Sequence, residues 1–236
     1  MEAQIDYKST AESLVDLLGH GLCSGLGKPE PGKMCVEAAV CYALGMDHGD
    51  DPKCVGRAVR KFKIRLNDSK WSSNEARGSG MLKLAIAQLG SNEIDQIEFA
   101  KKLSLRTCNE FLPFFLADKM PDFDTSGLVS VGDLKTARSE ARSAYAAADA
   151  DAAAYAAAYA ADAAYAAAYA ADAAYAAADA AADAAFAAAF AAADAAAYAA
   201  ADDDKYLVKM AEIGLSVLIE MKSPGCEFLY LTEQTK

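Results

Sequence analysis

The stretch DAAAYAAAYAADAAYAAAYAADAAYAAADAAADAAFAAAFAAADAAAYAAAD, from Asp151 to Asp202, decides the fold class of this chain. Each of its 15 residues that are not alanine follows the previous one at a step of three or four, and the other 37 residues are alanines. The mean step is about 3.6 residues, which is one turn of an α-helix. The tyrosine, phenylalanine and aspartate side chains therefore share one line along a helix, and methyl groups cover the rest of its surface.

Nothing in the surrounding sequence interrupts this helix. Alanine has the highest helix propensity, and there is no glycine between Gly132 and Gly214 and no proline between Pro121 and Pro224. Unbroken, the segment would be roughly 78 Å long at about 1.5 Å per residue. A compact domain of this chain length has a smaller diameter. We therefore expect the helix either to project from the body or to fold back as a hairpin.

The alanine face and the aromatic line suggest different uses. Small side chains let backbones approach closely, so the alanine face is suited to packing on other helices or on a second copy of the chain, as in a homo-oligomer. The line of tyrosines and aspartates would then face water or a partner. A spacer or scaffold helix is the plainer interpretation, and binding of a protein partner is the alternative. The candidate partner-binding residues are Tyr155, Tyr159, Tyr165, Tyr169 and Tyr175.

The remaining sequence predicts an all-α fold, because apolar residues recur at helical spacing between loops rich in Gly, Pro and Asp. We expect a small N-terminal helical domain, then a very long or hairpin Ala-rich helix, then a C-terminal amphipathic helix with a docking tail. The three parts cover residues 1–129, 130–204 and 205–236. Helices are expected over residues 10–19, 34–44, 54–66, 73–89, 92–116 and 206–221, and an extended tail over residues 226–232.

Local signals mark where several of these helices begin or bend. Thr10 is expected to cap the first helix, and Asp50 and Asp51 to cap the helix that follows the HGDDP loop. Ser73, or the residue after it, is expected to cap the helix that ends near Leu89. Proline cannot donate a backbone hydrogen bond, so Pro113 predicts a kink or an interruption.

Charge is distributed unevenly along the chain. The net charge is −11, and the segment 143–204 contains ten aspartates and no lysine or arginine. The segment 53–83 has the opposite character, with nine lysines and arginines against one aspartate and one glutamate. Such a basic block can meet an anionic ligand or the aspartates of the same protein. The overall acidity argues against non-specific binding of nucleic acid.

The basic block contains the only tryptophan, Trp71, in the sequence NDSKWSS. Polar side chains around an aromatic ring suit a small anionic, nucleotide-like ligand, although a tryptophan that anchors the core is the plainer interpretation. We therefore expect a non-enzymatic binding protein. The candidate ligand-binding residues are Arg57, Arg65, Asn67, Trp71 and Arg77.

Catalysis by a cysteine is the weaker alternative. Cys35 stands at a predicted helix start, where the helix dipole lowers the pKa of a thiol, and His48 is a candidate base. The intervening helix is about 16 Å long, so His48 would struggle to reach the thiol. A buried structural cysteine is the better interpretation, and we expect no catalytic residue.

No metal or other cofactor is expected. The set Cys23, Cys35, Cys41, His48 and Cys54 lacks the closely spaced cysteine pairs of structural zinc sites, although His48 and Cys54 could share a metal. The loop at residues 27–34, GKPEPGKM, matches most of a phosphate-binding loop but lacks its final hydroxyl, and its two prolines remove backbone donors.

The six cysteines and the lack of a signal-like N-terminus favour reduced thiols in the cytoplasm. No run of 18 or more strongly apolar residues predicts a membrane span.

Three blocks resemble segments of bacterial and phage proteins that also carry expandable Ala-rich helices. The blocks are GKMCVEAAVCYALGMDHGDDPKCV, RAVRKFKIRLNDSKWSS and SPGCEFLYL. The resemblance covers about two-thirds of the chain and implies a bacterial or phage origin, but no activity, cofactor or site. Ala-rich helical arrays are similar in composition to immunity proteins of bacterial toxin systems. A protein partner of immunity, defence or anti-defence type is therefore the alternative to a small ligand.

Overall fold

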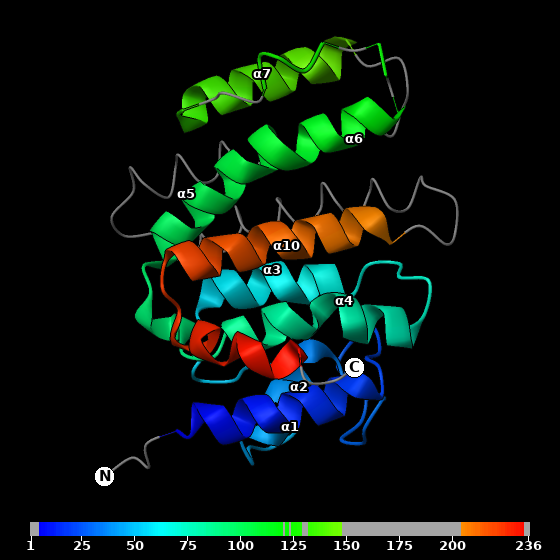
Figure 1. Ribbon diagram of the computed structural model, residues 1–236, viewed down its shortest axis with the longest axis vertical. Coiled ribbons are helices and arrows are strands. Elements are labelled where there is room, and N and C mark those ends of the chain that lie inside the picture. The colour runs from blue at the N-terminus through cyan, green and yellow to red at the C-terminus, as the bar shows by residue number, and fades with distance from the viewer. Residues whose placement is uncertain (1–4, 120, 123, 129–131, 148–203, 234–236) are drawn as a thin grey trace.

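The computed structural model describes residues 5–119, 121–122, 124–128, 132–147 and 204–233 (Figure 1). Within these residues the chain forms eight α-helices and no strand, which confirms the all-α prediction. The tract from Asp151 to Asp202, with the expected long or hairpin helix, lies outside the described residues. No helix in the described ranges is both long enough and apolar enough to cross a membrane.

The described residues form two kinds of element, α-helices and helical segments of other types. The α-helices are α1 (Tyr7–Gly19), α2 (Val36–Ala43), α3 (Arg57–Asn67), α4 (Asn74–Ala87), α5 (Gln96–Arg106), α6 (Leu112–Lys119), α7 (Leu134–Ala147) and α10 (Lys205–Glu220). The other helical elements are the 3-10 turn η1 (Ser91–Glu93), the π-helical turn η2 (Thr107–Phe111) and the 3-10 helix η3 (Pro224–Glu233).

Helix α4 lies at the centre of the packing. It contacts α1 and α2 from the N-terminal part and α10 and η3 from the C-terminal part. In Figure 1, α1 and α2 lie at one end of the molecule, α7 lies at the other, and α10 runs between them. Buried side chains from both parts, such as Leu14, Phe62, Tyr206 and Val217, share one core. The C-terminal helix is therefore an integral part of the body.

Two glycines allow α4 to be approached closely. A Cβ atom on Gly78 would lie 2.5 Å from the carbonyl oxygen of Leu18 and 2.9 Å from Cα of Gly21. A Cβ atom on Gly80 would overlap the six-membered ring of Trp71, which is itself buried. Both positions therefore require glycine because of tertiary contacts, although glycine costs helix propensity.

Gly80→Ala is expected to destabilise the fold and to shift the fluorescence of Trp71, the only tryptophan. Overpacking against the ring costs about 1–3 kcal/mol, which offsets or exceeds the gain in helix propensity of about 1 kcal/mol. Urea unfolding and the emission maximum measure the two effects. The matched control is Gly19→Ala, whose added methyl group meets no atom within 4 Å and should cost nothing. If Gly80→Ala has wild-type stability and emission, the close packing of Trp71 on α4 is wrong.

The first residues of α10 are fixed to two other parts of the fold. The Asp204 carboxylate accepts hydrogen bonds from the backbone N–H of Ser72 at 2.8 Å and from its hydroxyl at 2.5 Å. The Asp118 carboxylate accepts from the Tyr206 hydroxyl and pairs with Lys205 at 2.9 Å. These bonds set where α10 begins and orient it along α4.

Some of the predicted helix starts are confirmed and others are wrong. Ser73 does cap α4, since its hydroxyl accepts from the N–H of Ala76 at 3.0 Å. The first helix begins earlier than expected because Asp6, and not Thr10, is its cap. The capping role expected of Asp50 and Asp51 is wrong. Helix α3 begins only at Arg57, after Gly56, and the Asp51 carboxylate instead pairs with Lys53 at 2.6 Å and with Arg60.

The expected interruption near Pro113 takes the form of the π-helical turn η2, which joins α5 to α6 without a break in the helical path. A π turn accommodates an extra residue and shifts the hydrogen bonds that a proline cannot complete.

The extended tail expected over residues 226–232 is wrong, because this segment belongs to the 3-10 helix η3. Its start is tied to the end of α4. The Ser223 hydroxyl donates to the carbonyl of Ala87 at 2.6 Å, and the N–H of Gly225 donates to the carbonyl of Leu89 at 2.7 Å. Because Ser223 and Gly225 donate to these carbonyls, the start of η3 is held against the end of α4.

Candidate functional site

Three of the predicted ligand-binding residues come together in the structure, but their polar atoms bond within the chain. The Asn67 amide donates to the carbonyl of Cys23 at 3.0 Å and accepts from the N–H of Val36 at 3.2 Å. The indole N–H of Trp71 donates to the carbonyl of Leu66 at 3.0 Å. Both side chains are buried.

Arg77 links the loop before α2 to α3 and α4. Its Nε donates to the carbonyl of Asn67 at 2.8 Å, and its Nη1 donates to the carbonyl of Leu22 at 2.8 Å and to Oδ1 of Asn74 at 2.7 Å. Only 6% of the residue is exposed, and burial lowers the pKa of its guanidinium. A ligand could reach this group only by displacing structural hydrogen bonds.

Arg57 and Arg65, the other members of the predicted set, lie on α3, where Arg57 is exposed and Arg65 is half-buried. Asn67 lines a cavity of about 30 Å³ together with Asp50 and Asp68. That volume is room for about one water molecule, and a nucleotide does not fit. Binding of an anionic ligand by these five residues stays a prediction. Asn67, Trp71 and Arg77 have a structural role, since each donates to a backbone carbonyl.

The tyrosines of the predicted partner-binding line all lie outside the described residues. Binding of a protein partner through Tyr155, Tyr159, Tyr165, Tyr169 and Tyr175 stays a prediction.

The cysteine and histidine that could form a catalytic pair are engaged in separate contacts. Sγ of Cys35 accepts from the N–H of Ala38 at 3.4 Å as the cap of α2, and Nε2 of His48 lies 3.1 Å from the carbonyl oxygen of Gly27. Burial raises the pKa of the Cys35 thiol to about 11 and outweighs the expected effect of the helix dipole. At neutral pH this thiol is protonated, which makes it a poor nucleophile.

Neither a phosphate cradle nor a metal cluster forms around these residues. In the loop before α2, the N–H groups of Lys28 and Lys33 donate to carbonyls of the same loop at 2.7 and 3.0 Å. They are therefore not available for phosphate. Among the described residues, no group of three or more His, Cys, Asp or Glu side chains is placed to hold a metal ion.

A buried ion pair joins α2 to α3. Nζ of Lys63 lies 3.1 Å from a carboxylate oxygen of Glu37, and both side chains are fully buried. Burial raises the pKa of the Glu37 carboxyl and lowers the pKa of the Lys63 ammonium. Because protein covers both groups completely, we assign them a structural role. The sequence contains a signal for this pair: Lys63 falls one turn after Val59 on the apolar face of its helix.

Removing one member of this pair is expected to leave a buried charge without its partner. Glu37→Gln or Lys63→Met should each lower the free energy of unfolding by about 3–5 kcal/mol. The control is the double variant Glu37→Leu with Lys63→Met, which replaces both charges by apolar groups of similar size and should be more stable than either single variant. Urea unfolding provides the measurement. Wild-type stability of the single variants would contradict full burial of the pair.

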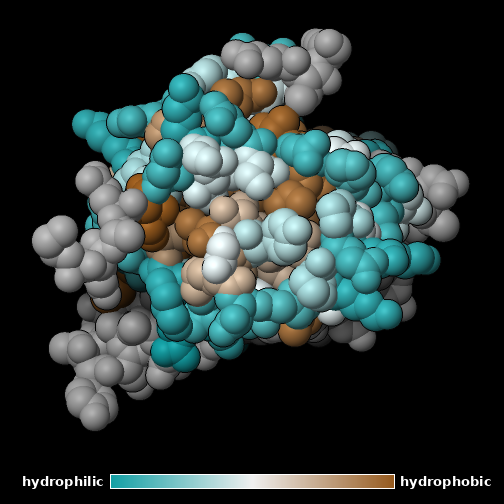
Figure 2. Space-filling model, turned by 90° about the horizontal axis from the view of Figure 1, so that it is seen from below, coloured by the Kyte–Doolittle hydropathy of each residue, from teal (hydrophilic) through white to brown (hydrophobic). Residues whose placement is uncertain are grey.

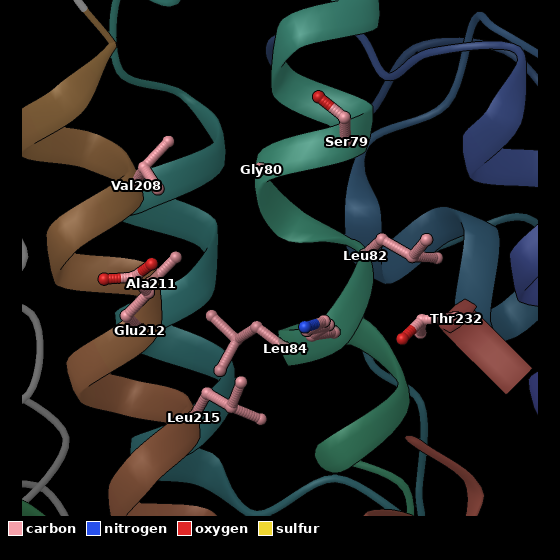
Figure 3. Close-up of a pocket in the computed structure, with 10 residues that line it drawn as sticks. Ser79, Gly80, Leu82, Leu84, Val208, Ala211, Glu212, Leu215 and Thr232 are labelled. Atoms are coloured by element: carbon pink, nitrogen blue, oxygen red, sulfur yellow. The ribbon is translucent and has the colours of Figure 1, made fainter. Parts of the chain in front are cut away.

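A further candidate site is a cleft of about 310 Å³ between α4 and α10 (Figure 3). The two helices run in the same direction along it, and η3 closes one side through Thr232. Leu82, Val208 and Leu215 line the cleft with side chains that are only half-buried. The full lining consists of Ser79, Gly80, Leu82, Lys83, Leu84, Val208, Ala211, Glu212, Leu215 and Thr232.

Two opposite charges stand at this cleft, Lys83 on α4 and Glu212 on α10. Both side chains are exposed, and neither takes part in an ion pair or a side-chain hydrogen bond within the described ranges. The cleft therefore combines an aliphatic lining with one available cation and one available anion. This combination is typical of small-molecule sites, which are mostly apolar with a few polar groups.

A second hollow lies on the other side of α4, between this helix and α1. It has a volume of about 390 Å³ and includes Val15 and Leu18 of α1. Ser79 and Leu82 line both hollows, so this part of α4 forms a ridge between them. Its charged side chain is that of Glu75, whose pKa is lowered by a hydrogen bond from its own backbone N–H and by a second one from the cap residue Ser73. The α4–α10 cleft is thus the better candidate.

Hydrophobic side chains are also exposed outside these two hollows. At the α1 end of the molecule, hydrophobic and near-neutral residues gather in the middle of a mostly hydrophilic face (Figure 2). The large hydrophobic residues most exposed in the described ranges come from different elements and define no single surface. They are Ile5, Leu26, Tyr42, Phe114, Ile219 and Tyr230.

None of the residues that line this cleft belongs to the ligand-binding set predicted from the sequence. Lys83 is the last residue of the basic block at residues 53–83, for which an anionic ligand was one of two interpretations. Val208, Glu212 and Leu215 follow more than 120 residues later, on a helix predicted only to be amphipathic. Amphipathic periodicity shows that one face is buried but not which helix it faces.

Comparison with models of protein families, with curated proteins and with solved structures finds no match for this chain. The resemblance of the three sequence blocks to bacterial and phage proteins thus gains no support from the family models.

Proposed function

We propose that this chain is a non-enzymatic binding protein that holds a small amphipathic ligand in the cleft between α4 and α10. The observation that carries the proposal is the partial exposure of Leu82, Val208 and Leu215 beside two charges with no partner in the described part of the chain. When a ligand covers half-exposed aliphatic side chains, the apolar area removed from water stabilises the complex by about 25 cal/mol per Å².

The proposal keeps the anionic ligand expected from the basic block but moves its contact to Lys83. Arg77 and Asn67 bond to backbone carbonyls, whereas Lys83 is exposed at the cleft. A binding role is supported over catalysis by the contacts of Cys35 and His48, which cap a helix and hold a loop.

Binding of 1-anilinonaphthalene-8-sulfonate to the folded protein tests the proposal. This probe has an apolar body and one negative charge, and it fluoresces when apolar surface takes it up. We expect Lys83→Glu to weaken binding about threefold to tenfold, since an exposed ion pair is worth up to about 1 kcal/mol and the reversal adds repulsion. Val208→Asp should weaken it further, because a carboxylate then stands in the apolar wall.

The control for charge is Lys28→Glu, which makes the same change on the exposed loop before α2. Circular dichroism should show unchanged helicity for all three variants. If Lys83→Glu and Lys28→Glu affect binding of the probe equally, and Val208→Asp has no effect, the probe does not bind in the cleft and the proposal is contradicted.

A further inference from the structure

The arrangement of charge in the α4–α10 cleft also indicates the class of ligand. This inference rests on the proposed function, because it concerns the same site. Lys83 and Glu212 belong to the two facing helices, and both remain without an ion pair in the described part of the chain. A ligand with a single negative charge would pair with Lys83 and be repelled by Glu212. A cationic ligand would pair with Glu212 and be repelled by Lys83.

We infer that the cleft binds a small aliphatic zwitterion of about dipeptide size, with its anionic group at Lys83 and its cationic group at Glu212. Only such a ligand satisfies both charges at once. A ligand that lies over the cleft displaces water from both side chains, so a ligand that supplies both counter-charges should bind better than one that supplies a single charge.

The apolar part of the cleft fits an aliphatic body. Leu84 of α4 points toward Leu215 of α10, and Leu82 points toward Thr232 of η3 (Figure 3). Val208 adds a third aliphatic side chain from α10, and the lining includes no aromatic residue. The volume of about 310 Å³ stands at the lower end of the range of about 300–1,000 Å³ for small-molecule sites. This favours a ligand smaller than a nucleotide.

The cleft also offers a polar contact for a peptide group. The Ser79 hydroxyl donates to the carbonyl of Ala76 at 3.1 Å, which leaves its oxygen able to accept a hydrogen bond. A peptide N–H between the two charged ends of a dipeptide is a donor of the required kind.

Four leucine dipeptides that share one aliphatic body but differ in end groups distinguish the contributions of the two ligand charges. Leucyl-leucine is a zwitterion, N-acetyl-leucyl-leucine an anion, leucyl-leucinamide a cation, and N-acetyl-leucyl-leucinamide is neutral. Isothermal titration calorimetry with the full chain should rank the zwitterion first. Loss of either charge should weaken binding about twofold to fivefold, the range for exposed ion pairs.

Two variants assign each charge to its partner. Glu212→Gln should abolish the advantage of the free amine and leave that of the free carboxylate, and Lys83→Met should do the reverse. Both residues are exposed, so the variants are expected to fold, and Glu227→Gln and Lys28→Met are controls on exposed residues elsewhere.

The outcomes separate this inference from the proposed function. If the fluorescent probe binds in the cleft but the four dipeptides bind equally or not at all, the zwitterion is wrong and the cleft remains a ligand site. If Glu212→Gln and Lys83→Met leave the ranking of the dipeptides unchanged, the dipeptides bind elsewhere, and this result also overturns the inference. If neither the probe nor any dipeptide responds to changes in the cleft, the proposed function itself fails.

Discussion

Close packing around the glycines of α4 is the constraint on which the rest of the structure depends. Gly78 lets α1 and the turn at Gly21 approach the helix backbone, and Gly80 lets the ring of Trp71 lie against it. With side chains at these positions, neither neighbour could keep its place. The same helix receives α10 on another side and η3 at its end, so α4 connects the N-terminal and C-terminal parts of the fold.

The candidate site is a consequence of this packing. Ser79 and Gly80 are small residues in one turn of α4, so this turn leaves space beside α10. The larger side chains of Leu82 and Leu215 line the cleft and stay half-exposed. The bonds from Asp204 to Ser72 hold the start of α10 in its place along the helix. Buried charge is used elsewhere, in the Glu37–Lys63 pair and at Arg77, to join helices and loops.

The sequence predicts most of the local structure and little of the site. Hydrophobic periodicity finds the helices, and local chemistry finds the Ser73 cap and the bend near Pro113, since both depend on neighbouring residues. The sequence-based prediction is wrong at Asp51, which pairs with Arg60 and does not cap a helix. It is also wrong in the tail, where hydrogen bonds to the end of α4 hold the helical segment η3. Arg77 and Trp71 resemble ligand contacts for the same reason that they stabilise the fold: both are large side chains that can form hydrogen bonds, and here they donate to backbone carbonyls.

The most direct test of the central claim is a ¹H–¹⁵N NMR titration of the full chain with leucyl-leucine. Backbone amide shifts report where a small ligand contacts a protein without any change to its sequence. The α4–α10 cleft predicts that the largest changes cluster at residues 79–84 and 208–215. A cluster centred on Arg57, Arg65 and Trp71, or no cluster at saturating peptide, would contradict binding of the zwitterion in this cleft.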